Sequence, residues 1–371
     1  MPIPSSGSTG RSGYTSEFPT EGRAGEPEEW FVPKRAGRCF GTGAGKVVGR
    51  VPPLLSALNA SGSVYVIGVA GDSGSGKTTF ASAIRHLLGD DLVATLSLDD
   101  YHLYDREERK KRGITPLSPD ANDFDRLERD VGRLRQGLSI QKMVYDHSNG
   151  TIHGPFPFQP AKILILEGLH AFFTEKLRRL CDFTLFVDPD PDVKKEWKFK
   201  RDTGARGYTE REVGDELTRR AMDYSAYVAP QREHATVVIG ISFSRFGRNL
   251  GWEENIYRVT LDLSPWDFYP ASASLSFDFR GITSAHGRPF SFLFRPAGYQ
   301  KRPAGTIELD GMLPCTCSES LVAFLEETTG RDPGNLLQEC RMLTPTDFTR
   351  LFVCGCIVTH RLSIAGNGTG S

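Results

Sequence analysis

A glycine-rich loop with the spacing G-x-x-x-x-G-K-[ST] occupies residues 71–78 and constrains this chain more than any other feature. The apolar residues 64–69 before it predict a buried parallel strand, and residues 79–88 after it predict a helix. In that context the glycines let successive backbone N–H groups turn inward as an anion nest, and the helix start adds the positive end of its dipole. The loop therefore predicts a nucleoside triphosphate site, and a chance glycine turn is the less favoured interpretation.

Two side chains of the loop have specific tasks. Lys77 has the length to reach the β- and γ-phosphates, and the Thr78 hydroxyl can complete the ligand shell of Mg²⁺. The residues expected to hold the nucleotide are Gly71, Asp72, Ser73, Gly74, Ser75, Gly76, Lys77, Thr78 and Thr79. A similar stretch at residues 41–47 lacks the first glycine, the hydroxyl residue and the preceding strand, so it is predicted to be flexible chain.

The whole chain has 371 residues and a formal net charge of −1. The length allows one large or two medium domains, and the charge gives no sign of nucleic acid or a membrane as a partner. No apolar run comes near the ~20 residues of a membrane span. Seven cysteines are an odd number in a long chain without a secretory signal, which favours reduced thiols. We therefore expect a soluble, cytoplasmic protein.

Hydrophobic patterning divides the chain into four parts. Residues 1–63 are rich in Gly, Ser, Pro and Glu and are expected to be disordered. Residues 64–248 alternate apolar runs with amphipathic segments, which predicts an α/β domain with a doubly wound, mostly parallel sheet of the P-loop NTPase type. Residues 249–360 predict a smaller α+β extension, a candidate dimer surface. Residues 361–371 are expected to form a flexible tail.

The strands and helices of this scheme can be assigned to residue ranges. Buried strands are expected at residues 64–69, 92–98, 163–166, 183–187 and 236–241. Helices are expected at residues 80–88, 126–136, 174–180, 193–202, 210–222 and 318–328. Because ligands of such sheets collect beyond the carboxyl ends of the strands, the functional residues are expected there.

Charged residues follow the second of these strands. Asp99 and Asp100 fall at its carboxyl end, across from the glycine loop, where a carboxylate can take the proton of an acceptor hydroxyl. Asp99 is our candidate base. His102 and Arg106 supply a hydrogen-bond donor and a fixed cation suited to a second, phosphorylated substrate. A solvated charged loop is the alternative interpretation.

Three further polar residues stand near other expected element ends. Glu167 ends the strand at residues 163–166, where it can orient Mg²⁺ or its water shell. Tyr145 and His147 lie in a predicted turn, either as sugar-phosphate contacts or as ordinary hairpin residues.

A basic segment, residues 197–208, carries Lys198, Arg201 and Arg206 in a helix and the turn after it. Cations on a mobile flap can close over the γ-phosphate, stabilise the charge of the transition state and exclude water. By composition alone, an ordinary basic surface helix is favoured.

Four motifs together, GDSGSGKTTF, LDDYHLYDR, EGLH and WKFKRDTGARG, resemble in this order the phosphoribulokinase branch of the phosphoribulokinase and uridine kinase family. The likeness covers residues 65–241, and the residues after Asn249 more loosely resemble the archaeal enzymes. It implies phosphorylation of ribulose 5-phosphate at its 1-hydroxyl by MgATP, giving ribulose 1,5-bisphosphate and ADP. Apart from the resemblance, we expect the protein to form a homodimer through the carboxyl-terminal extension.

The resemblance also implies a role for each motif residue. Asp99 would be the general base and Glu167 the metal-associated carboxylate. Phosphoryl transfer would be assisted by Lys77, Lys198, Arg201 and Asp202. The sugar phosphate would be contacted by His102, Arg106, Tyr145, His147 and Arg206.

One departure from the family is informative. Plant-type members are switched by a disulfide between a cysteine of the phosphate loop and one just before the DDYH motif, and this chain has Ser75 and Ser97 at those positions. Serine forms no such bridge, so the resemblance implies a chain without that thiol switch.

Two other functions remain open. A uridine or cytidine kinase of the same family is the first, although His102, Arg106 and His170 suit a phosphorylated sugar better. The second is a non-catalytic ATP-binding module whose carboxyl-terminal part binds a protein, although such a module needs no base.

Cysteine pairs near the carboxyl end offer one more possibility. Cys315, Cys317, Cys354 and Cys356, with His360, could hold zinc, but their one-residue gaps are shorter than those of a usual zinc knuckle. Reduced structural thiols are the favoured interpretation.

Overall fold

Strand β1 (Tyr65–Gly71) runs through the middle of the sheet, and all of its residues are buried. It pairs in parallel with β5 (Ile163–Gly168) on one side and β6 (Phe183–Pro189) on the other. Outside these, β2 (Val93–Ser97) pairs with β5 and β7 (Val237–Phe243) with β6, also in parallel. The predicted parallel, doubly wound core is confirmed, and its carboxyl ends meet at one edge.

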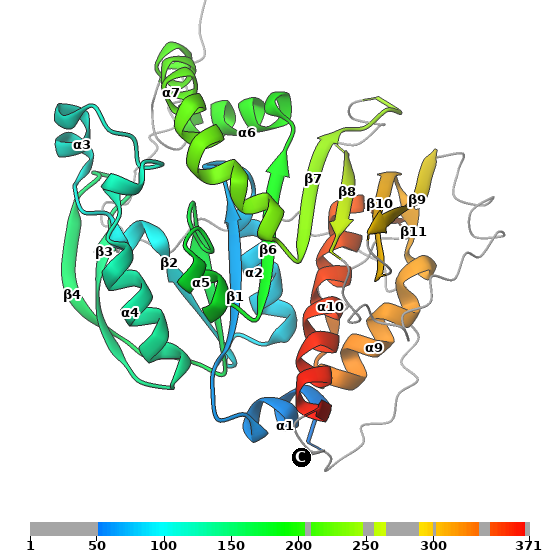
Figure 1. The fold of residues 1–371 in the computed structure, drawn as a ribbon. Coiled ribbons are helices and arrows are strands. Elements are labelled where there is room, and N and C mark those ends of the chain that lie inside the picture. The colour runs from blue at the N-terminus through cyan, green and yellow to red at the C-terminus, as the bar shows by residue number, and fades with distance from the viewer. Residues whose placement is uncertain are drawn as a thin grey trace, which may run out of the picture. The chain divides into compact units, whose positions relative to one another are not determined.

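The structure is a computed structural model that describes residues 51–204, 209–247, 256–264, 289–299, 302–333 and 342–367. Beyond β7 the sheet continues with antiparallel strands, so its order is β2-β5-β1-β6-β7-β8-β10-β9 (Figure 1). The added strands are β8 (Tyr257–Leu263), β9 (Phe290–Tyr299) and β10 (Arg302–Gly311). The predicted extension is therefore built onto the edge of the same sheet.

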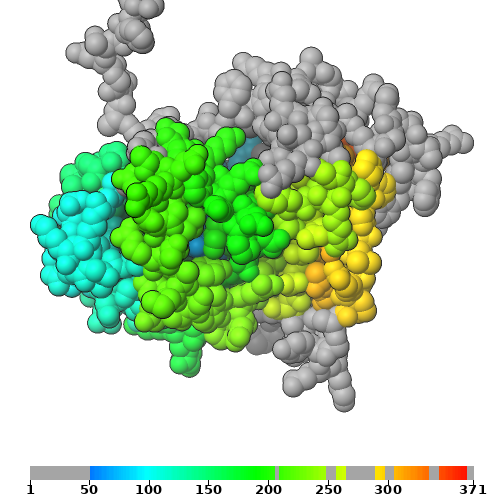
Figure 2. Space-filling view, turned by 90° about the horizontal axis from the view of Figure 1, so that it is seen from above, coloured from blue at the N-terminus to red at the C-terminus, as the bar shows by residue number. Residues whose placement is uncertain are grey.

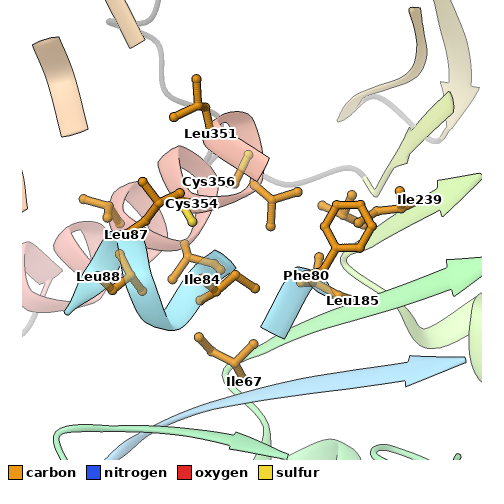
Figure 3. Packing of buried hydrophobic residues seen from close by; sticks show 14 of the residues in the cluster. Ile67, Phe80, Ile84, Leu87, Leu88, Leu185, Ile239, Leu351, Cys354 and Cys356 are labelled. Atoms are coloured by element: carbon orange, nitrogen blue, oxygen red, sulfur yellow. The ribbon is translucent and has the colours of Figure 1, made fainter. Parts of the chain in front are cut away.

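Alternate residues of the central strands face opposite sides of the sheet. On one side, Ile67 packs with Ile84 of α2 (Lys77–Leu88) and Leu351 of α10 (Pro345–Asn367), as Figure 3 shows. This core joins the helix that follows the glycine loop to a helix near the end of the chain. The position of α2 is thereby fixed by packing far from the loop itself.

The other side of the sheet is covered by α4 (Phe124–Arg135) and α5 (Glu175–Leu180). Val66 of β1 belongs to this second core together with Val131 of α4. Asp123 caps α4 by accepting a hydrogen bond from the Arg126 N–H at 3.0 Å.

The chain between β2 and β5 contains elements that the hydrophobic pattern did not predict. The 3₁₀ turn η1 (Leu98–Tyr101) follows β2 directly, and α3 (Arg106–Arg112) and the short turn η2 (Pro119–Ala121) come next. Beyond α4, β3 (Ile140–Tyr145) and β4 (Ile152–Phe158) form a separate two-stranded hairpin. Tyr145 and His147 were expected in a turn: Tyr145 is the last residue of β3, and His147 lies in the turn between the two strands.

Two helices lie above the carboxyl ends of the strands, α6 (Pro191–Gly204) and α7 (Glu210–Asp223) (Figure 1). A capping box between Thr209 and Glu212 begins α7. Seen from above, green atoms from this part of the chain cover most of the blue that marks β1 and α2 (Figure 2). The π-helical turn η3 (Tyr224–Val228) and η4 (Ala229–His234) then lead back to β7.

Two expectations about the chain ends are wrong for the residues that the structure describes, while residues 1–50 and 368–371 lie outside the described residues. Helix α1 (Pro53–Ala60) falls within residues 1–63, which were expected to be disordered, and its Leu54 and Leu58 are buried. Helix α10 continues into the predicted tail, where Arg361 is buried and donates to the Ala57 main-chain oxygen. The two helices therefore stabilise each other, which neither segment's composition could reveal. The remaining described elements are β11 (Leu313–Pro314), η5 (Cys315–Ser318), α9 (Glu319–Thr329) and β12 (Met342–Leu343).

Helix α10 also corrects the expectation that no apolar segment approaches the length of a membrane span. Residues Pro345–Ala365 are long and apolar enough to cross a membrane by length and composition alone, but 61% of the most apolar stretch is buried inside the protein. Its Leu351, Cys354 and Ile357 belong to the core under α2. A core helix accounts for this composition.

Candidate active site

Three glycines shape the loop at residues 71–78. Gly71, Gly74 and Gly76 have φ angles of +151°, +78° and +91°, which other residues rarely adopt. A Cβ at Gly71 would lie 2.4 Å from the main-chain oxygen of Val187, so the loop also presses against β6. Helix α2 begins directly after Gly76. The backbone thus has the turn and the helix start of an anion-binding nest.

The side chain of Lys77 lies buried under this loop. Its Nζ donates to the main-chain oxygen of Asp72 at 2.7 Å. Burial lowers the pKa of Lys77, and the carboxylates of Glu167, Asp99 and Asp72 oppose that effect. The structure therefore brings the loop lysine into the field of Glu167, near the end of β5, and of Asp99, just after β2. Of the other loop residues expected to bind nucleotide, Ser75 is buried and Thr79 is exposed.

Thr78 and Glu167 stand together at the ends of α2 and β5. The Thr78 hydroxyl donates to Glu167 Oε1 at 2.7 Å. Neighbouring oxygen ligands of an octahedral Mg²⁺ are ~2.9 Å apart, given metal–oxygen distances of ~2.0–2.1 Å. These two oxygens therefore fit the expected metal, whose chemistry would be to neutralise charge on the bound phosphates.

Asp72 connects the loop to the two helices above it. Lys194 Nζ of α6 lies 2.9 Å from Asp72 Oδ2, and an Arg220 nitrogen of α7 lies 3.8 Å from Oδ1. Burial would raise the pKa of Asp72, but the charges of Arg220 and Lys194 outweigh it and hold the pKa below its usual range. Asp72 therefore acts as an anchor between the loop and the helices.

Of the cations predicted on α6, Arg201 brings its guanidinium to the loop, whereas Lys198 approaches it with Cβ and pairs its Nζ with Glu216. Lys198 Cβ and an Arg201 guanidinium nitrogen each lie 3.6 Å from the position that a Cβ would take at Gly74, and Arg201 also contacts the Ser73 hydroxyl at 3.4 Å. Arg201 Nε donates to Asp202 Oδ1 at 2.8 Å. Arg206, the third predicted cation, lies outside the described residues.

Lys198 is held by an acid that the sequence did not single out. Its Nζ lies 3.1 Å from Glu216 Oε1, and Arg220 donates to the same oxygen at 2.6 Å. Burial lowers the pKa of Lys198, with Arg220 acting in the same direction and Glu216 against it. The buried ammonium therefore depends on Glu216 for its charge partner.

Asp99 lies just beyond β2 with a histidine on each oxygen. His147 Nε2 is 3.2 Å from Oδ2, and His102 Nε2 is 3.7 Å from Oδ1. Burial would raise the pKa of Asp99, but the His147 hydrogen bond and the charges of His102, His147 and Lys77 hold it well below its usual range. Its side chain is still 29% exposed. An ionised, reachable carboxylate can accept a proton from a hydroxyl.

The neighbouring Asp100 has a different environment. Its carboxylate is buried, accepts a hydrogen bond from the Tyr145 N–H at 2.9 Å and pairs with Lys142. Asp100 therefore fastens η1 to β3. Asp99, by contrast, interacts through its charge with Lys77 of the glycine loop.

Tyr145 and His147 line the same site from the hairpin. The rings of His102 and Tyr145 meet edge to face at 5.1 Å, and those of Tyr145 and His147 at 5.0 Å. The Tyr145 hydroxyl accepts a hydrogen bond from buried Arg109 at 2.8 Å. The three rings therefore form one wall beside Asp99.

Arg106 begins α3 and reaches back to the hairpin turn. Its NH2 group donates to the His147 main-chain oxygen at 2.6 Å, and its Cβ lies 2.5 Å from where a Cβ would stand at Gly150. Arg106 thus fixes the part of the turn that carries His147.

His170 lies deeper in the same region. It is 97% buried, between the rings of Phe124 and Phe173, and neither ring nitrogen makes a hydrogen bond of normal geometry with the described residues. Burial lowers its pKa to about 4, although the Leu117 main chain lies close enough to oppose that effect. A small cavity, with room for about one water, is lined by His170, Asp99, Tyr101 and Asn122 among others.

Sequence reasoning missed Arg109, Lys194, Glu216 and Arg220. Arg109 stands one helical turn after Arg106, a spacing that could have drawn attention to it. The other three lie in highly charged helices in which exposed and buried charges look alike. Their pairing with Asp72 and Lys198 depends on helix packing.

Zinc ligation finds no support in the structure. Among the described residues, His, Cys, Asp and Glu side chains form no group of three that could hold a metal ion. Cys354 and Cys356 are buried in α10, and burial raises the pKa of both thiols. They are therefore poor sources of thiolate.

Comparison with known proteins agrees with this site. The pattern of the Phosphoribulokinase / Uridine kinase family matches residues 66–243. The phosphoribulokinase of Synechocystis sp. is 33% identical over 264 residues, which cover 67% of this chain and 76% of the relative. The chloroplastic phosphoribulokinase of Mesembryanthemum crystallinum is 35% identical over 51% of this chain and 52% of its own. The chain thus spans about half the length of that chloroplastic relative.

Two further comparisons give the breadth of the likeness. The uridine kinase of Lactobacillus helveticus is 33% identical over 47% of this chain and 85% of its own. The solved structure of the phosphoribulokinase from Rhodobacter spheroides matches 82% of this chain and all of its own, with a TM-score of 0.50. Because the two sequences are only 18% identical, this similarity supports the fold alone. With the nucleotide loop and both strand-end carboxylates in place, this chain belongs to the phosphoribulokinase and uridine kinase family of P-loop kinases.

Proposed function

We propose that this protein is a phosphoribulokinase, which transfers the γ-phosphoryl group of MgATP to the 1-hydroxyl of ribulose 5-phosphate. The observation that carries the proposal is the pairing of Asp99 with His102 and His147 opposite the nucleotide loop. In support, the phosphoribulokinase of Synechocystis sp. is similar over a longer part of this chain than the uridine kinase of Lactobacillus helveticus.

The chemistry follows from where the charges lie. The 1-hydroxyl oxygen attacks the γ-phosphorus while the bond from that phosphorus to the β–γ bridging oxygen breaks, and the hydroxyl proton passes to Asp99. We expect Lys77, Lys198 and Arg201 to stabilise the negative charge on the transferred group and on the departing ADP. In support, Lys77 is buried in the loop and the Arg201 guanidinium lies beside Gly74, while Lys198 would have to exchange its partner Glu216 for phosphate. Thr78 and Glu167 would hold Mg²⁺.

The acceptor's existing phosphate needs cations at the other end of the site. We expect Arg106 to bind that phosphate, since its guanidinium has five N–H donors and gives one to the His147 main-chain oxygen. His102 and His147 would line the site beside it, and Arg109 holds Tyr145 in the wall. A nucleoside carries no phosphate to pair with Arg106, which favours the phosphorylated sugar. Arg206 belongs to the same proposal from sequence alone.

The test is an ADP-release assay with MgATP and one of three acceptors: ribulose 5-phosphate, uridine, or none. We expect ribulose 5-phosphate to raise ADP release far above the other two. Stimulation by uridine alone would make the protein a nucleoside kinase. No stimulation by either, with ATP still bound, would favour a binding module.

Other parts of the proposal stand on sequence alone. They are a homodimeric assembly, a cytoplasmic location, an archaeal type of carboxyl-terminal part, and no nucleic-acid or membrane partner. Sedimentation of the purified chain at several concentrations would test the dimer.

A further inference from the structure

A groove of about 460 Å³ lies outside the candidate active site, between α4 and the start of β3. We call it the arginine groove. It is lined by Arg126, Arg129, Asp130 and Arg133 of α4, and by Ser139, Ile140 and Gln141. Its volume falls within the usual range of small-molecule sites, roughly 300–1,000 Å³. Figure 1 shows α4 beside the β3–β4 hairpin.

Two of the three arginines are held in place by main-chain oxygens of β3 and of the residue just before it. Arg126 donates to the Gln141 main-chain oxygen at 2.9 Å, and Arg133 to the Ser139 main-chain oxygen at 3.3 Å. Each contact uses one of the five N–H donors of a guanidinium group. The arginines are therefore oriented with donors to spare.

The groove carries more positive than negative charge. Its one acid, Asp130, has a side chain only 9% exposed and lies 3.6 Å from Arg126 Nε and 3.9 Å from Arg129 Nε. Three guanidinium groups thus line the groove with one largely buried carboxylate, which Arg126 and Arg129 share. Arg129 and Arg133 are exposed, Arg129 with 64% of its side chain.

Asp130 also connects the groove to the candidate active site. The Tyr101 hydroxyl donates to Asp130 Oδ2 at 3.2 Å, and the Arg126 guanidinium lies 5.8 Å from the centre of the Tyr101 ring. Tyr101 is the last residue of η1, the turn that carries Asp99. A ligand that draws Arg126 or Arg129 away from Asp130 would change the surroundings of the hydrogen bond between Tyr101 and Asp130. Movement of Arg126 would also remove its contact with the Tyr101 ring.

We propose that the arginine groove binds a small polyanion, such as a phosphorylated metabolite, and that Asp130 and Tyr101 couple its occupancy to η1. Three arginines at the spacing of one helix face match the phosphate or carboxylate groups of a small molecule. The limited volume of the groove and its three cations favour a small ligand over a nucleic-acid strand. The inference does not rest on the proposed kinase activity.

The binding test uses inorganic pyrophosphate as the probe, measured by calorimetry on the full chain carrying Lys77→Ala, which weakens anion binding at the nucleotide loop. In that background, Arg129→Gln with Arg133→Gln is expected to lower pyrophosphate affinity at least tenfold, since each loses a charge-assisted contact. Arg179→Gln is the matched control, because Arg179 is 77% exposed and pairs only with Glu175 among the described residues. It should change affinity less than twofold.

Equal affinities in the double variant and the control would overturn the site. So would binding of a ten-residue thymidine oligonucleotide without binding of pyrophosphate. Circular dichroism of each variant shows that a loss of affinity does not come from unfolding.

The coupling is tested by hydrogen exchange of the amides at residues 98–102, with and without pyrophosphate, in the same Lys77→Ala chain. We expect pyrophosphate to change their exchange rates by threefold or more. Tyr101→Phe should keep the pyrophosphate affinity within about twofold and abolish that change. An unchanged exchange rate in the Lys77→Ala chain with bound pyrophosphate would refute the coupling.

Discussion

His147 Nε2 lies 3.2 Å from Asp99 Oδ2, although one residue follows a core strand and the other sits in the turn of a separate hairpin. Arg106 secures that turn from a third element by donating to the His147 main-chain oxygen. The candidate base Asp99 is therefore positioned by segments that precede α4 in the sequence and by a hairpin that follows it. Changes in the hairpin are expected to affect the charge of Asp99.

The first prediction concerns Asp99→Asn. An amide cannot accept the hydroxyl proton, so kcat should fall by roughly 10²–10⁴-fold, while ATP affinity measured by calorimetry should stay nearly unchanged. Asp100→Asn is the comparison, because Asp100 pairs with Lys142 and should mainly lower thermal stability. If Asp99→Asn turned over at the normal rate, Asp99 would have no part in the chemistry.

The second prediction separates two arginines of α3. Arg106→Ala should raise KM for ribulose 5-phosphate by about 10- to 100-fold, the value of a lost charge-assisted contact, with KM for ATP unchanged. Arg112→Ala is the control, since Arg112 is half exposed and pairs with Glu108. An Arg106 effect confined to ATP would contradict its placement at the acceptor.

The third prediction uses glycines to test the loop. Gly71→Ala should destabilise the fold by about 3 kcal/mol or more, because of the φ angle of +151° and the contact with Val187. Gly132→Ala should instead stabilise it by about 0.5–1 kcal/mol, since Gly132 is inside α4 and a Cβ there meets nothing within 4 Å. Urea denaturation at pH 7 measures both. Equal effects would mean that the loop tolerates a side chain.

The fourth prediction concerns acid stability. Burial lowers the pKa of His170 to about 4, whereas an unfolded histidine titrates near 6.5. As pH falls below 6.5, the unfolded chain takes up the proton first, so stability is lost between about pH 6.5 and 4. From pH 7 to 5, His170 should account for about 2 kcal/mol of that loss.

Urea denaturation at pH 7 and pH 5 checks this value. In His170→Gln the fall in unfolding free energy between the two pH values should be smaller by about 2 kcal/mol. His153→Gln is the control, because His153 is exposed. An identical fall in His170→Gln and the unaltered chain would show that His170 is protonated as easily in the fold as outside it.

The fifth prediction concerns thiol chemistry. The positions of the plant-type disulfide hold Ser75 and Ser97, so treatment with an oxidant and then a dithiol should leave the ADP-release rate unchanged. Buried Cys354 and Cys356 should resist alkylation in the folded chain, because burial raises the pKa of both thiols. Reversible inactivation by oxidation would point to another cysteine pair.

Local sequence alone determined the nucleotide loop and the parallel core. The phosphate-loop motif is recognised from the spacing of its glycines, Lys77 and Thr78 within eight residues. The buried strands are recognised from short apolar runs, without knowledge of which segments pack against them. Asp99 and Glu167 could also be located, because the end of a parallel strand is a fixed place in such a sheet.

Only the tertiary structure decided which charges meet. The pairing of Asp99 with His147, of Lys198 with Glu216, and of Asp72 with Lys194 joins residues far apart in the chain. Helices α1 and α10 were missed for the same reason, since each is stabilised by burial against the other and little by its own composition. Packing between distant segments has no local signal, and for that reason the sequence could not reveal it.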